Sequence, residues 1–265
     1  MNLDIYTSEM AKSIWDKAFF MDKIPGAKCV IDFGCADGAM IRYLSTLYPD
    51  ITFIGYDINK ELIDMARKTL PFNTNLIYFC GIWEGLSDLE EYVFDHFKEQ
   101  EICINFSSVL HEVYSSTGGI EVITELIGKL EPRYITIRDM YCDDPVPFSD
   151  SHNEYKLADV IQNDRKLYHY TQAFVEKFGT ANDWRDIMHL LMKLQWIDNG
   201  WDEEMKENYF SWSIDKFIDD IGGNYIPSFD CRYQLPYLGE KWKKEYGWYN
   251  PDIHTHAQFI LRRDD

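Results

Sequence analysis

The chain has 265 residues, of which 46% are apolar and 16% aromatic, and its 26 basic and 45 acidic residues give a formal charge of −19. This length and apolar content exclude a disordered chain and are typical of one large domain or two small ones. The acidic balance argues against duplex DNA as a partner, because DNA binding draws most of its affinity from lysine and arginine.

Helix and strand patterns alternate along the first half of the chain. Residues 8–21 have the spacing of an amphipathic helix. Short runs rich in isoleucine, valine and aromatic residues predict five strands, and the segments between them predict four helices. The strands are expected over residues 28–33, 52–57, 75–80, 101–107 and 133–139, and the helices near residues 38–48, 60–69, 86–98 and 117–130.

The pattern changes after Asp139. The following residues show helical stripes and no clear strand, with Asn182 and Ser213 as expected N-caps. Two strands return over residues 225–235 and 255–262, with a short helix near 238–246 between them. We therefore expect a Rossmann-like core over residues 1–141, a mainly helical insertion over 142–224, and closing strands of the core over 225–265.

Strands that alternate with helices predict a doubly wound α/β fold, with a parallel sheet covered on both faces. The six cysteines form no CxxC pair, which predicts reduced thiols in a cytoplasmic protein. The first 15 residues lack the layout of a signal peptide, and no run of 18 apolar residues exists. No membrane association is therefore expected.

The segment CVIDFGCADGAM joins an apolar strand to a glycine turn. The strand reaches an acidic residue, Asp32, and glycines follow at Gly34 and Gly38. Ligands of an open α/β sheet bind beyond the carboxyl ends of the strands, and glycine lets the backbone approach them closely. The end of this strand is therefore the first place to expect a ligand.

The turn does not match the dinucleotide fingerprint G-x-G-x-x-G, because Ala36 stands where the middle glycine would be. The carboxylates of Asp32 and Asp37 would also repel a pyrophosphate. They favour a cationic ligand such as S-adenosylmethionine (SAM), which carries a sulfonium and an ammonium but no phosphate. A nicotinamide-dependent oxidoreductase is accordingly disfavoured.

A second carboxylate, Asp57, ends the neighbouring strand, 23 residues beyond Gly34. A carboxylate at this position can accept hydrogen bonds from both ribose hydroxyls. The alternative is a turn residue before the helix that follows Asn59, and one side chain can serve both purposes.

Together, VIDFGCADG and GYDIN resemble motifs I and II of class I SAM-dependent methyltransferases, although many members have glycine at the position of Ala36. The resemblance covers residues 1–140 and about 225–265. It implies a seven-stranded sheet with an antiparallel last strand, a substrate-facing insertion, SAM as cofactor and S-adenosylhomocysteine (SAH) as product. It also implies cofactor binding by Asp32, Gly34, Ala36, Gly38, Asp57, Ile58, Gly81, Ile82, Trp83, Asn105, Phe106 and Ser107.

Two residues near the ends of the fourth and fifth strands are candidate catalytic groups. His111 can act as a general base or be a helix histidine bonded to backbone. Asp139 can act as a base, or form a salt bridge or a cap. No tight ligand spacing appears among His152, Glu154, His169 and His189, so no metal site is expected.

The sequence thus favours SAM-dependent O- or N-methylation of a small or medium-sized acceptor. Two alternatives remain open: a non-catalytic module or partner subunit that binds SAM or a nucleoside, and an RNA methyltransferase. The acceptor, the atom methylated and the oligomeric state are not predicted.

Overall fold

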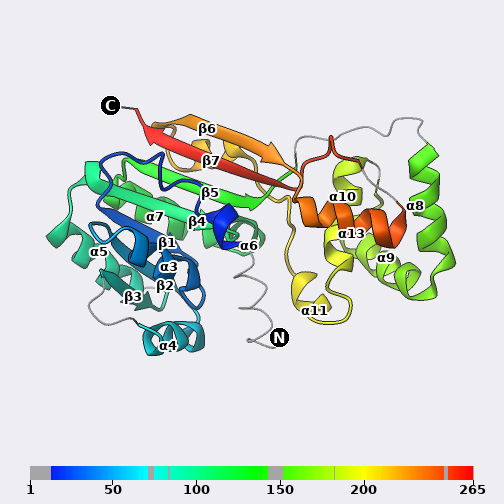
Figure 1. The fold of residues 1–265 in the computed structure, drawn as a ribbon, viewed down its shortest axis with the longest axis horizontal. Coiled ribbons are helices and arrows are strands. Elements are labelled where there is room, and N and C mark those ends of the chain that lie inside the picture. Colours follow the sequence, from blue (N-terminus) through cyan, green and yellow to red (C-terminus); the bar gives the residue numbers. More distant parts are fainter. Residues whose placement is uncertain are drawn as a thin grey trace. The chain divides into compact units, whose positions relative to one another are not determined.

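The computed structural model describes residues 13–70, 75–82, 84–142, 152–181, 183–247 and 250–264. Its strands form one seven-stranded sheet in the order β3-β2-β1-β4-β5-β7-β6 (Figure 1). The strand β1 (Cys29–Phe33) lies between β2 (Thr52–Asp57) and β4 (Ile102–Ser107). Parallel pairing continues outward to β3 (Leu76–Cys80) and to β5 (Tyr134–Met140).

The last two strands are β6 (Tyr225–Tyr233) and β7 (His256–Arg263), and β7 runs against β5. The N–H of Tyr141 donates to the carbonyl of Thr255 at 2.9 Å, whereas the N–H of Arg263 donates to the carbonyl of Arg133 at 3.0 Å. Residue numbers therefore rise along β5 while those of their partners fall along β7, which defines an antiparallel pair. The predicted seven-stranded doubly wound fold with an antiparallel last strand is confirmed.

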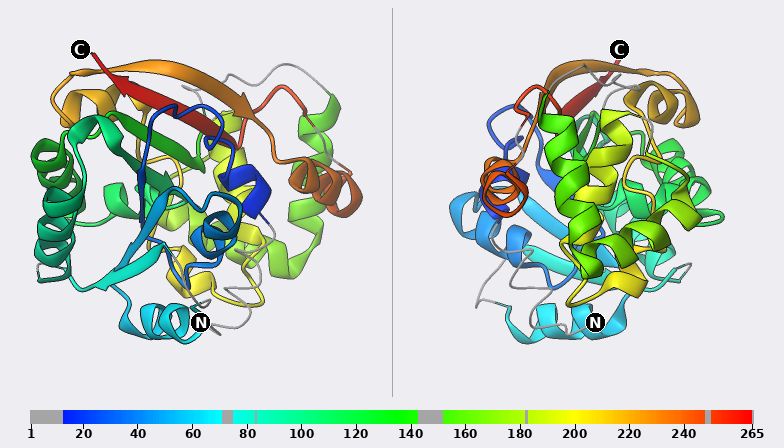
Figure 2. Two further views of the ribbon diagram at one scale, coloured as in Figure 1. Left: turned by 60° about the vertical axis from the view of Figure 1, so that its left-hand side comes forward. Right: turned by 90° about the vertical axis from the view of Figure 1, so that its right-hand side faces the viewer.

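Helices cover both faces of the sheet (Figure 2). On one face, α3 (Ala39–Leu47) and α4 (Lys60–Lys68) pack apolar residues such as Ile41 and Ile63 onto Val30 and Phe53 of the strands. On the other face, α5 (Glu84–His96) and α7 (Gly119–Leu130) contact each other. The strands are buried from both sides, which explains their continuous apolar runs.

Two helices differ from the prediction. Over residues 13–21 the only helix is α2 (Ile14–Lys17), followed by turns, so the expected helix over 8–21 is shorter there, and its residues 8–12 lie outside the described part. The helix α6 (Leu110–Ser115) lies outside the predicted helix ranges, although a helix was one of the two alternatives kept open for His111. It is short and precedes Gly118 and Gly119, and its apolar residues are too few to show a helical period.

The chain divides into two compact units. The sheet unit comprises residues 2–139, 214–231 and 258–265, including α12 (Ile214–Asp220), and the helical unit comprises residues 140–213 and 232–257. The division into a cofactor-binding core and a substrate-facing insertion, with boundaries at residues 141 and 224, remains a prediction about function.

The helical unit contains α8 (His152–Asn163), α9 (Arg165–Phe178), α10 (Trp184–Leu194), α11 (Trp201–Glu204) and α13 (Pro236–Tyr246). Its core is aromatic and aliphatic, with Phe174, Met188 and Trp242 almost completely buried. The N-cap of α10 is Asp183, whose carboxylate accepts from the N–H of Asp186 at 3.0 Å. The expected cap, Asn182, lies outside the described residues.

Among the residues that the structure describes, every helix is too short or too polar to span a membrane.

Candidate functional site

The carboxyl ends of the parallel strands bring the candidate residues to one edge of the sheet. In register, Phe33 lies beside Tyr56 on β2 and beside Phe106 on β4. The pairing continues with Asp57 beside Cys80 on β3 and Ser107 beside Arg138 on β5. Residues that are far apart in the sequence therefore meet where an α/β sheet binds its ligands.

The turn between β1 and α3 is held by the backbone of β2. The N–H groups of Gly34 and Cys35 both donate to the carbonyl of Tyr56, at 2.8 and 3.0 Å. Gly34 has φ +77°, and a Cβ at this position would lie 2.7 Å from Cγ2 of Val109. Ala36 is also left-handed, with φ +51°. A residue with a Cβ thus occupies a conformation that favours glycine.

Gly38 ends the turn with φ +69° and precedes the first residue of α3. A Cβ on Gly38 would overlap the hydroxyl of Tyr78, which comes from β3 and packs under the turn. Within the described part of the chain, this buried hydroxyl has no hydrogen-bond partner. The glycine is therefore required by close packing as well as by its backbone conformation.

Asp57 joins the turn to the end of β2. Its Oδ2 accepts from the N–H of Ala36 at 2.9 Å, and its Oδ1 accepts from the N–H of Asn59 at 2.8 Å. Burial raises the pKa of this carboxyl, while the N–H groups of Asn59 and Ala36 act in the opposite direction. The cap of α4 is the Asn59 side chain, so Asp57 is not the capping residue.

The segment after β3 is fixed by a tyrosine that the sequence analysis did not single out. The hydroxyl of Tyr56 donates to the carbonyl of Gly81 at 2.8 Å and to that of Ile82 at 3.1 Å. Ile82 is 52% exposed, and Ile58, at the end of β2, is 65% exposed. Exposed aliphatic side chains at two neighbouring strand ends offer apolar contact to a ligand. Trp83 lies outside the described residues.

Asp32 belongs to a buried polar chain across three strands. The amide nitrogen of Asn105 donates to Oδ1 of Asp32 at 2.7 Å, and the hydroxyl of Thr136 donates to Oδ1 of Asn105 at 2.8 Å. Burial raises the pKa of Asp32 to about 7, opposed by the Asn105 hydrogen bond and the Lys17 charge. Burial and the Arg138 charge lower the pKa of Lys17 to about 8.

The residues that follow in β4 and its turn differ in their exposure and bonding. Asn105 and Phe106 have no exposed surface, whereas Ser107 is 9% exposed. The Ser107 hydroxyl is buried without a hydrogen-bond partner among the described residues. A buried hydroxyl without a partner lowers the stability of the fold unless a ligand or a water molecule forms a hydrogen bond with it.

The turn after Ser107 is tied to α2 and β7 by a second polar chain. Ser108 is left-handed at φ +58°, and its hydroxyl accepts from Nη1 of Arg138 at 3.0 Å. Arg138 also donates from Nε to Oδ2 of Asp16 at 2.6 Å, and Gln258 donates to Oδ1 of Asp16 at 2.9 Å. Asp16 is too distant in the sequence for this contact to be visible there.

His111 and Asp139 form a buried pair. The Nδ1 atom of His111 lies 2.7 Å from Oδ1 of Asp139, and the backbone N–H of His111 donates to Oδ2 at 3.1 Å. The exposed fractions are 3% for His111 and 0% for Asp139. The sequence predicts two separate candidate bases, and the structure joins them through both carboxylate oxygens of Asp139.

Comparisons with known proteins give one match in sequence and several in fold. No family model matches the chain. A stretch of 54 residues is 39% identical to "Putative methyltransferase 235L" of Invertebrate iridescent virus 6, and it spans 20% of this chain and 20% of the viral protein.

Two solved structures have similar folds across nearly the whole chain. One is a chain of the complex between the Trm112 methyltransferase activator of Haloferax volcanii and a "putative methyltransferase", with TM-score 0.53, 11% identity and coverage of 99% of this chain and 95% of that one. The other is an S-adenosylmethionine-dependent methyltransferase from Mesorhizobium loti, with TM-score 0.50, 10% identity and coverage of 95% and 97%. The strand order and the antiparallel β7 are those of the Rossmann-like methyltransferase fold.

Proposed function

We propose that this chain is a SAM-dependent methyltransferase that acts on a hydroxyl or amine of a small or medium-sized acceptor. The observation that carries the proposal is the carboxylate of Asp57, which is bonded to the Ala36 N–H of the glycine turn and lies at the end of β2. A carboxylate has about four acceptor sites, so the hydrogen bonds from the N–H groups of Ala36 and Asn59 leave capacity for ribose hydroxyls.

Other residues at this edge fit the rest of SAM. Ile58 and Ile82 are exposed and would contact the adenine, while the Tyr56 hydroxyl holds the Gly81–Ile82 segment in place. The Ser107 hydroxyl, which has no hydrogen-bond partner among the described residues, would bind a polar group of the methionine part. Gly34, Ala36 and Gly38 would present the turn backbone to the cofactor, and Trp83 remains a predicted adenine neighbour.

Three of the proposed cofactor residues would act through other residues. Asn105 and Phe106 have no exposed surface, and the Asn105 side chain is bonded on both sides, to Asp32 and to Thr136. We therefore assign to Asp32, Asn105 and Phe106 the role of fixing the strand ends. When it is ionised, the carboxyl of Asp32 would also contribute negative potential beside a cationic cofactor.

His111 is the proposed general base and Asp139 its positioning residue. If Nδ1 of His111 donates to Asp139, the lone pair of the ring lies on Nε2, where it can accept a proton from the acceptor. SAM supplies an electrophilic methyl group on its sulfonium, so the protein needs mainly to align the acceptor and remove its proton. Because His111 is only 3% exposed, the acceptor atom must itself enter the site to reach the ring.

The formation of SAH with a panel of hydroxyl- and amine-bearing small molecules tests the reaction. We expect formation that depends on the acceptor and that falls in Asp139→Asn, with SAH affinity unchanged. An unchanged rate of SAH formation in Asp139→Asn would show that the His111–Asp139 pair does not act as the general base. SAM binding without acceptor-dependent SAH formation would support the non-catalytic module instead.

A further inference from the structure

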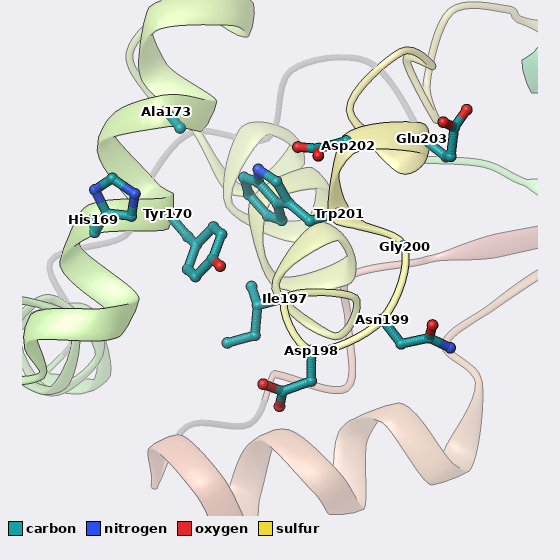
Figure 3. A pocket seen from close by; sticks show the side chains of 10 residues that line it. All are labelled: His169, Tyr170, Ala173, Ile197, Asp198, Asn199, Gly200, Trp201, Asp202 and Glu203. Atoms are coloured by element: carbon teal, nitrogen blue, oxygen red, sulfur yellow. The ribbon is translucent and has the colours of Figure 1, made fainter. Parts of the chain in front are cut away.

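A cavity of about 560 Å³ lies wholly within the helical unit (Figure 3). Its walls come from α9, from the turn after α10 and from α11, and they include Tyr170, Ile197, Asp198, Trp201, Asp202 and Glu203. This volume is within the range of about 300–1,000 Å³ that is typical of small-molecule sites. None of these residues belongs to the proposed SAM site.

One wall of the cavity is aromatic. The rings of Tyr170 and Trp201 pack edge to face, with centroids 4.7 Å apart and an interplanar angle of 65°. In Figure 3 the two side chains approach each other from α9 and α11, above Ile197. Both residues are only partly buried, so ring surface is available to a ligand. The face of an aromatic ring attracts cations.

The rim of the cavity is acidic. Three of its ten lining residues are carboxylates, and none of the ten is a lysine or arginine. Lys166 lies 2.5 Å from Asp198, and Lys206 lies 2.6 Å from Glu203, in exposed pairs. Exposed pairs of this kind contribute little free energy and exchange readily. Asp202 has no ion pair within the described ranges, so its charge is available to a ligand.

We propose that this cavity binds an organic ammonium group, either of a free polyamine or of a lysine side chain in a peptide. The aromatic wall and the Asp202 carboxylate both stabilise a positive charge, and the rim repels anions. A bare divalent metal ion fits less well, because a metal prefers several converging oxygen ligands, whereas the face of an aromatic ring offers it none. The inference rests on the helical unit alone and does not depend on methyl transfer.

Calorimetric titration of the full chain tests this site with four probes. The cationic probes are spermidine and a capped peptide Gly-Gly-Lys-Gly-Gly, and each has a fully acetylated, uncharged counterpart. We expect at least one cationic probe to bind, with affinity that falls as salt rises, and its acetylated counterpart not to bind. Spermidine alone would identify a free polyamine as the ligand, and the peptide alone would identify a peptide segment.

Four variants assign the binding to this cavity. Tyr170→Leu removes the ring and should weaken binding by about three- to tenfold, whereas Tyr170→Phe keeps the ring and should bind as the parent does. Asp202→Asn removes one exposed charge and should weaken binding by about twofold to fivefold. Glu240→Gln removes an exposed charge on α13, outside the cavity, and should have no effect.

The proposal is overturned if neither cationic probe binds or if the acetylated probes bind equally well. It is also overturned if Asp202→Asn and Glu240→Gln give the same affinity as the parent. Thermal unfolding of each variant identifies any loss that comes from misfolding of Tyr170→Leu. Asp202 is exposed and forms no ion pair with any described residue, so Asp202→Asn should fold as the parent does. It therefore still tests the cavity if Tyr170→Leu misfolds.

Discussion

The polar residues of the two units are held in different ways. At the sheet edge, side chains bond to the backbone of neighbouring segments, as Asp57 does with Ala36 and Tyr56 with Gly81. Around the cavity of the helical unit, Asp198 and Glu203 pair with exposed lysines, and Asp202 has no ion pair among the described residues. The first arrangement would present a fixed set of groups to the proposed cofactor. The second would leave charge available to the proposed organic ammonium ligand.

The largest effect is expected from Asp57→Ala. It removes both proposed ribose hydrogen bonds to a charged acceptor and should weaken SAH binding by about a hundredfold or more. Asp64→Ala is the matched control, because Asp64 on α4 forms an ion pair with Lys60 and with no other described residue. Calorimetry measures both affinities, and equal losses in the two variants would contradict the assignment. Thermal unfolding shows whether the turn remains folded without the Asp57 bonds.

A smaller effect is expected from Gly38→Ala, compared with Gly247→Ala in the helical unit. The two glycines have similar left-handed φ angles, +69° and +62°, but of the two, Gly38 alone packs against a described side chain, that of Tyr78. Both substitutions introduce a backbone strain of about 1–2 kcal/mol. Gly38→Ala should cost about 1–3 kcal/mol more through overpacking. Chemical denaturation measures the difference, and equal costs would show that Tyr78 moves aside freely.

The pH dependence of stability should also separate the units. The pKa of Asp32 is about 7 when folded, above its ordinary value of 3.8, so the folded state loses stability as pH rises from about 4 to 7. The slope from this carboxyl is at most about 1.4 kcal/mol per pH unit. Asp32→Asn should remove this slope and gain stability relative to the parent as pH rises. If the stability of Asp32→Asn depended on pH as the parent's does, a group other than Asp32 would be responsible for that dependence.

The smallest effect is expected from Tyr56→Phe. Loss of the hydroxyl frees the carbonyls of Gly81 and Ile82, so the segment that would contact adenine is less well fixed. SAH binding should weaken by about three- to tenfold. Tyr225→Phe removes a comparable bond to the carbonyl of Pro132, at the opposite edge of the sheet, and should not change SAH affinity. The reverse order of effects would exclude the proposed role of Tyr56.

The strands of the sheet could be predicted closely because each one is marked by a pattern of neighbouring residues in the sequence. Each parallel strand is a short apolar run, and the predicted 52–57 coincides with β2. Glycine and aspartate at the strand ends then indicate where a ligand binds. The fold predicted from these patterns is confirmed, while the roles of the individual site residues remain proposals.

The remaining parts depend on contacts between distant residues. Thr136, Asp16 and Tyr56 have no local signal, since each acts through a partner on another segment. The pairing of His111 with Asp139 spans 28 residues and becomes visible only when β4 and β5 lie side by side. In the helical unit, the pattern predicted helices but not the cavity, because the cavity requires α9 and α11 to be packed together.

Calorimetric titration of the unmodified protein with SAM, SAH and NAD tests the proposed cofactor site without any substitution. We expect SAM and SAH to bind and NAD not to bind, because the carboxylates near the glycine turn disfavour a pyrophosphate. Absence of binding by both adenosyl ligands to a folded protein, or tighter binding of NAD, would contradict the claim that the carboxyl edge of the sheet is a SAM site.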